Sequence, residues 1–154
     1  MRNASNYNLL ATVALAALVT FATSPALAGS KVNADKSGVA IKGYDPVAYF
    51  TSSKPTAGNA ELTHRWNNAT WRFANAENKK AFVANPTKYA PQYGGYCAFA
   101  VSQGNLAPID PKAWRIVDGK LYLNYNTAVQ KKWEKDRKNF IRLADEKWPE
   151  LGGK

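Results

Sequence analysis

The chain has 154 residues and a formal net charge of +10 at pH 7, with one cysteine, one histidine and one methionine, which is the initiator. A single thiol excludes an intramolecular disulfide, and one thiol with one imidazole is too few for the four nitrogen or sulfur ligands of a closed structural zinc site. Catalysis by a thiol and a histidine base is restricted to Cys97 and His64.

Residues 1–28 have the pattern of a secretory signal peptide. Arg2 precedes an apolar run over residues 9–22, which is shorter than the roughly 20 residues that span a bilayer. An Ala-Leu-Ala sequence ending at Ala28 favours cleavage between Ala28 and Gly29. We therefore expect a periplasmic or secreted protein with no transmembrane segment after cleavage. Loss of Arg2 changes the formal charge from +10 to +9, which favours anionic surroundings.

The polar residues 29–38 predict a flexible leader, and one domain is expected over residues 39–150. A short strand is predicted at residues 39–41. The Asp45-Pro46 pair then predicts a short helix over residues 47–50, because aspartate accepts hydrogen bonds from the first helical turn and proline fits that turn.

A first β-hairpin is predicted where residues 64–66 and 70–73 flank a turn at Asn67-Asn68. Asn75 is expected to cap the helix that follows, and Asn85-Pro86 is expected to end it.

A second β-hairpin is predicted more strongly, because Asp118-Gly119 tolerates the positive φ angles of a two-residue turn between residues 114–117 and 120–125. Asn126 is expected to cap a C-terminal helix that ends at Pro149. Together these elements predict an α+β domain, in which small antiparallel hairpins pack with short helices and a longer C-terminal helix.

Four segments resemble exported YHS-domain proteins: residues 43–50, 64–82, 85–90 and 94–97. The YHS domain is similar to treble-clef metal-binding knuckles. The resemblance implies a small metal-associated module.

The chain departs from the ligand-bearing members of that family at three positions. They carry cysteines where this chain has Ala48, Ala74 and Asn78. Alanine offers no lone pair and asparagine is a poor ligand for soft metals. The inherited thiolate site therefore cannot form.

A replacement metal site would have to use Cys97 and His64, completed by a carboxylate such as Asp45 or Asp110, or by a second subunit. Such a donor set would suit copper or zinc. The alternatives are a buried structural thiol and an imidazole that only hydrogen-bonds a neighbouring backbone group. Gly94-Gly95, just before the cysteine, frees the backbone for a tight turn or a close approach.

Two functions are consistent with these features. The first is an exported YHS-family binding module that is associated with copper or zinc and is not an enzyme, because no third residue orients a Cys97–His64 pair. The second is an interaction protein of the cell envelope without a metal site, whose basic surface meets an anionic polymer. Nucleic acid is not expected as a partner of an exported protein. The five tryptophans are expected to pack in the core rather than to form an exposed platform for a sugar or quinone.

Overall fold

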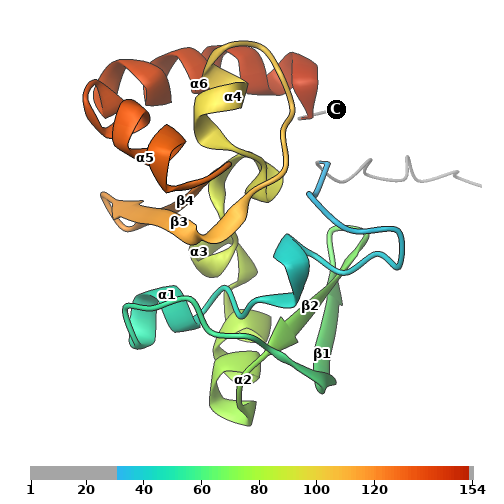
Figure 1. Cartoon of the computed structure of the whole chain (residues 1–154). Coiled ribbons are helices and arrows are strands. Elements are labelled where there is room, and N and C mark those ends of the chain that lie inside the picture. The colour runs from blue at the N-terminus through green and yellow to red at the C-terminus, as the bar shows by residue number, and fades with distance from the viewer. Residues whose placement is uncertain (1–30, 153–154) are drawn as a thin grey trace, which may run out of the picture.

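The computed structural model describes residues 31–152 (Figure 1), so the predicted signal peptide lies outside the described residues. Within this range the chain forms six α-helices, two short 3-10 helices and two separate antiparallel sheets of two strands each, which confirms the predicted α+β class. In chain order the elements are η1 (Ile41–Gly43), α1 (Ala48–Thr51), β1 (Asn59–Trp66), β2 (Ala69–Phe73), α2 (Ala76–Ala84), α3 (Pro86–Tyr89), η2 (Gln92–Gly95), α4 (Ala98–Ser102), β3 (Asp110–Val117), β4 (Lys120–Asn124), α5 (Thr127–Glu134) and α6 (Arg137–Leu151). None of the helices in residues 31–152 has the length and apolar character needed to cross a bilayer.

Both predicted hairpins are confirmed. Strands β1 and β2 turn at Asn67 and Asn68, with φ angles of 51° and 61°. Strands β3 and β4 turn at Asp118 and Gly119, with φ angles of 50° and 72°. Two successive positive φ angles give a turn whose twist matches that of the flanking strands, which is why these residue pairs predict hairpins well.

Strand β4 lies between two hydrophobic clusters, because its side chains alternate between opposite faces. Leu121 and Leu123 belong to a cluster formed with η1, α1, α2 and the first hairpin, whereas Tyr122 belongs to a cluster formed with α4, α5 and α6. Figure 1 shows the same arrangement, with α4, α5 and α6 on one side of the second hairpin and the first hairpin with α2 on the other.

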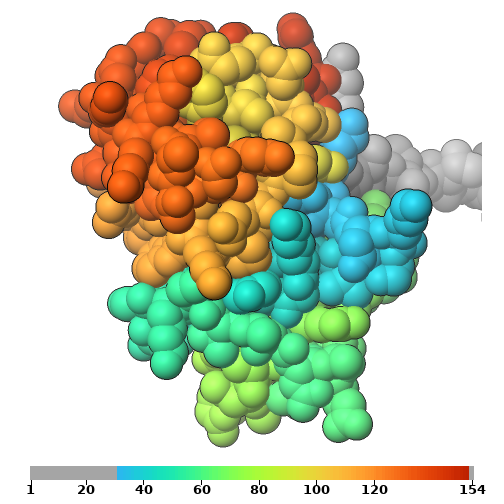
Figure 2. All heavy atoms as spheres, in the orientation of Figure 1, coloured from blue at the N-terminus to red at the C-terminus, as the bar shows by residue number. Residues whose placement is uncertain are grey.

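The described part of the predicted leader, residues 31–38, does not form a free arm. The backbone N–H of Lys31 donates to Gly152 O at 2.7 Å, and that of Asn33 donates to Gly94 O at 2.9 Å. Gly94 allows this approach, because its φ is +60° and a Cβ there would lie 1.9 Å from the Lys31 carbonyl oxygen. Figure 2 shows this blue segment between the C-terminal part of the chain and the green first hairpin.

The strand predicted at residues 39–41 is reduced to isolated bridges. Val39 pairs with Thr70 in parallel, and Ala40 pairs with Ala34 in antiparallel. The chain then enters η1 instead of continuing as a strand.

The predicted C-terminal helix is two helices. Asn126 caps α5 as expected, by accepting the Val129 N–H at 2.8 Å. However, α5 ends at Glu134 and α6 begins at Arg137, which allows both helices to pack into the second cluster. Pro149 lies inside α6 rather than at its end.

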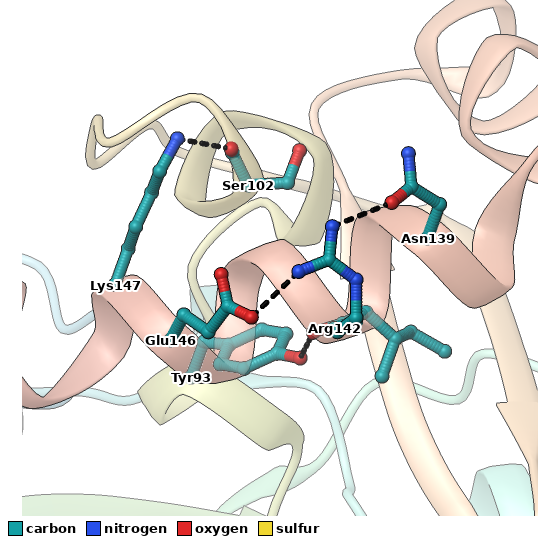
Figure 3. A network of polar contacts seen from close by, with 7 residues as sticks. Tyr93, Ser102, Asn139, Arg142, Glu146 and Lys147 are labelled. Carbon is teal, nitrogen blue, oxygen red and sulfur yellow. Dashed lines mark hydrogen bonds and ion pairs between the residues drawn. The ribbon is translucent and has the colours of Figure 1, made fainter.

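Polar contacts fix α6 to two other elements (Figure 3). The Tyr93 hydroxyl, from η2, lies 2.8 Å from Asp145 Oδ1 and 3.3 Å from Ile141 O. Lys147 Nζ donates to the Ser102 carbonyl, at the end of α4, at 2.8 Å. The position of α6 is therefore set by hydrogen bonds as well as by apolar packing.

The second cluster predicts alkaline destabilisation. Burial, assisted by the Asp145 carboxylate, raises the pKa of Tyr122 from 10 to about 12 and raises that of Tyr93 further. Because the folded state disfavours the phenolate, this stabilisation is complete below pH 10 and is lost as the pH rises toward 12. Urea unfolding between pH 8 and 11.5 should therefore show stability falling above pH 10, with a smaller slope for Tyr122→Phe. Equal slopes for the two proteins would contradict this assignment.

Candidate functional site

The first candidate ligand, Asp45, is a fully buried carboxylate with both oxygens engaged. Oδ1 accepts the N–H groups of Val47 at 2.8 Å and Ala48 at 3.3 Å. Oδ2 accepts the Ala74 N–H at 2.8 Å and the Asn78 side-chain amide at 2.7 Å. These four hydrogen bonds join the start of α1 to the region between β2 and α2, so Asp45 acts as a structural group here.

The same contacts show where the three positions compared above with cysteines lie. Ala48, Ala74 and Asn78 all donate to the one Asp45 carboxylate, although Ala48 is distant in the sequence from the other two. Ala48, Ala74 and Asn78 are thus gathered around a negative charge that is satisfied by hydrogen bonds. A cation is not needed to balance the polar groups at this point.

The second candidate ligand, Cys97, is 1% exposed and is the N-cap residue of α4. Its Sγ accepts the N–H of Tyr125 at 3.2 Å and of Ala100 at 3.5 Å, and it donates to Asn124 Oδ1 at 3.8 Å. Burial raises the pKa of the thiol, and the backbone N–H donors oppose that rise. The arrangement is that of a capping thiol within the core.

Asn124 is a buried polar residue that no motif or spacing in the sequence indicates. It is fully buried, and its Oδ1 also accepts the Phe99 N–H at 3.2 Å, while its Nδ2 has no hydrogen-bond partner among residues 31–152. The role of Asn124 can be recognised only from the fold, which brings the end of β4 against the start of α4.

The third candidate ligand, His64, lies on β1, opposite Trp71 in the hairpin register. Its ring is half-buried and packs edge-on to Phe82, with ring centroids 6.4 Å apart. The imidazole therefore contributes to an aromatic cluster formed with α2.

The candidate ligands are not gathered with a third donor in the part of the chain that the structure describes. No group of three or more histidine, cysteine, aspartate or glutamate residues within residues 31–152 is placed to hold a metal ion. Asp45 has both oxygens engaged, and Asp110 accepts the Lys112 N–H at 2.9 Å. The residues present do not fit a closed zinc or copper site built on Cys97.

A concave site with a different chemistry lies between the turn of the second hairpin and the start of α6. We name it the basic pocket; its volume is about 150 Å³. Its lining residues are Lys120, Arg137, Lys138, Asp118, Val117, Tyr122 and Ile141. The sequence does not indicate this pocket, because nothing in the local pattern places the turn of a hairpin beside the start of α6.

A larger pocket of about 190 Å³, which we name the aromatic pocket, lies where the two hydrophobic clusters meet. Its lining includes Trp66, Trp71, Tyr93, Trp148, Thr87 and Gln92. Trp66 and Trp148 are only partly buried, so the expectation that the tryptophans serve core packing alone is too simple for these two.

Comparison of the chain with family models, with curated proteins and with solved structures gives no match. The candidate sites therefore rest on the residues of this chain alone.

The role of Asp45 can be tested by Asp45→Asn. Asparagine keeps one oxygen but places an N–H₂ group against the donors of Ala74 and Asn78, which leaves buried donors unpaired. We expect a loss of about 3 kcal/mol in the free energy of unfolding, measured in urea. The matched control is Asp110→Asn, because the exposed bond from Lys112 survives that change and the loss should stay below about 0.5 kcal/mol. Similar losses for both variants would contradict the assigned role.

The role of Cys97 can be tested by metal analysis and thiol titration of the protein purified from the periplasm without an affinity tag. Because Cys97 is 1% exposed, we expect no stoichiometric copper or zinc and a thiol that reacts only after unfolding. Near-stoichiometric metal that is lost in Cys97→Ser would instead support a metal site.

Proposed function

We propose that this chain is an exported, non-catalytic binding module, related to YHS-domain proteins, that binds an anionic polymer of the cell envelope through the basic pocket. The observation that carries this proposal is the gathering of three exposed cations, Lys120, Arg137 and Lys138, around one pocket. Within residues 31–152 their side chains make no ion pair and no hydrogen bond.

The charge in the pocket is not balanced by its own residues. Asp118 is the one carboxylate among the lining residues, against three cations. A phosphate or carboxylate group of a ligand would complete this arrangement. Arg137 can bind such a group through two parallel hydrogen bonds, and the lysines can add charge-assisted bonds.

Two other cations near the pocket are paired. Arg115 lies 2.6 Å from Glu134, and Arg142 lies 2.6 Å from Glu146, as Figure 3 shows for the second pair. The cations of the basic pocket thus differ from their neighbours in having no intramolecular partner in the described structure, although the surrounding sequence alternates in sign.

The surface favours a polymer over a lipid bilayer. Proteins that lie on a bilayer add large apolar side chains to the charged face. The large hydrophobic residues that are exposed in residues 31–152 are Val83 and Tyr125, and neither lines the basic pocket.

Two further observations support the remaining parts of the proposal. The convergence of Ala48, Ala74 and Asn78 on Asp45 is what kinship with the YHS domain would produce, because those positions share one metal in ligand-bearing members. Export is supported by the signal-peptide pattern of residues 1–28.

The test is binding to long-chain inorganic polyphosphate, which serves as a polymer of repeated phosphates, at a series of NaCl concentrations. We expect the affinity to fall as salt rises. The double variant Arg137→Gln/Lys138→Gln should bind roughly tenfold to thirtyfold more weakly, at about 1 kcal/mol for each cation removed.

The matched control is Lys36→Gln/Lys80→Gln, which removes the same charge from two exposed positions outside the basic pocket. It should weaken binding less than about threefold, because neither lysine lines the basic pocket and salt screens interactions between exposed charges. Equal losses in the two double variants would contradict a pocket-based site. Binding to phosphatidylglycerol vesicles without binding to polyphosphate would contradict the choice of a polymer.

A further inference from the structure

The aromatic pocket has a chemistry that the basic pocket lacks. No lysine, arginine, aspartate, glutamate or histidine lies among its lining residues, although the whole chain carries a formal charge of +10. Burial of an ionic ligand there would leave its charge uncompensated. The lining therefore favours an uncharged ligand.

The walls of the pocket come from both hydrophobic clusters. Trp66 and Trp71 contribute one aromatic pair, with ring centroids 6.0 Å apart and planes inclined at 55°. Tyr93 and Trp148 contribute the other, at 5.9 Å and 63°. Ring faces of this kind pack against flat, partly apolar ligands.

Polar groups with unused hydrogen-bonding capacity interrupt the aromatic lining. The Gln92 side chain and the indole N–H groups of Trp66 and Trp148 have no hydrogen-bond partner among residues 31–152. The Thr87 hydroxyl lies 3.0 Å from Asn85 Oδ1, so it can donate there and still accept a bond from a ligand. The lining residues thus carry both donors and acceptors.

Hydrogen bonds within the protein also hold the walls of the aromatic pocket in place without a ligand. The Trp71 indole donates to Trp66 O at 3.0 Å, and Tyr93 is held by Asp145 at 2.8 Å. The Gly94 carbonyl accepts the Asn33 N–H at 2.9 Å. Little ordering of the walls would be needed on binding.

The volume of about 190 Å³ corresponds to roughly six water molecules in the liquid. It suits a single ring and not an extended chain. A pyranose combines apolar C–H faces with hydroxyl groups that both donate and accept. A quinone carries acceptors only and would leave the amide oxygen of Gln92 and the oxygen of Thr87 without a donor.

We propose that the aromatic pocket binds one ring of an uncharged saccharide. This site is separate from the basic pocket, so its ligand can be tested without reference to the anionic polymer.

The test uses ¹H–¹⁵N spectra of the protein labelled at its five tryptophans, assigned by single Trp→Phe variants. The probes are the methyl glycosides of glucose, galactose and N-acetylglucosamine. At least one should shift the indole signals of Trp66, Trp71 and Trp148 in a saturable manner. The signals of Trp114 and Trp133, which do not line the pocket, should stay in place and serve as internal controls.

The contribution of Gln92 is tested by Gln92→Ala, which should weaken binding roughly threefold to tenfold through the loss of hydrogen bonds. The matched control is Gln103→Ala, at an exposed position outside the pocket, which should leave the affinity unchanged. Failure of all three glycosides to shift the pocket indoles would overturn the proposal. So would shifts produced by glucuronic acid or glucosamine at lower concentration than by the neutral glycosides, or by benzoquinone alone.

Discussion

The buried carboxylate of Asp45 is the contact on which the first half of the fold depends. It satisfies four donors that come from the start of α1, from the residue after β2 and from α2. Without it, these donors would be buried and unpaired, which costs more than any one of the hydrogen bonds contributes. The Asp45 carboxylate therefore joins the start of α1 to the end of β2 and to α2.

Local chemistry made much of the fold predictable. Asn67-Asn68 and Asp118-Gly119 adopt the positive φ angles that their side chains tolerate, and both hairpins follow from that. Asn75 and Asn126 cap helices through their own side chains, as residues of that type do. These features depend on a few neighbouring residues.

The candidate sites are formed by residues that are distant in the sequence. Their positions could therefore be predicted from the sequence less well than the hairpins and helix caps. Cys97 and His64 are chemically capable ligands, but the fold places one under the backbone amides at α4 and the other beside Phe82. The basic pocket requires a hairpin turn to lie next to the first turn of α6. That placement depends on the break between α5 and α6. No proline or glycine lies between these two helices, so the break could not be predicted from the sequence.

The alternation of side chains along β4 makes both clusters depend on one choice of strand pairing. Ile116 faces Leu121 and Arg115 faces Tyr122 across the second hairpin. A slip of this pairing by a single residue would turn Leu121 and Leu123 toward the helices and Tyr122 toward the first hairpin, so that each cluster would receive the side chains shaped for the other. The two-residue turn that sets the pairing thereby determines the composition of both halves of the interior.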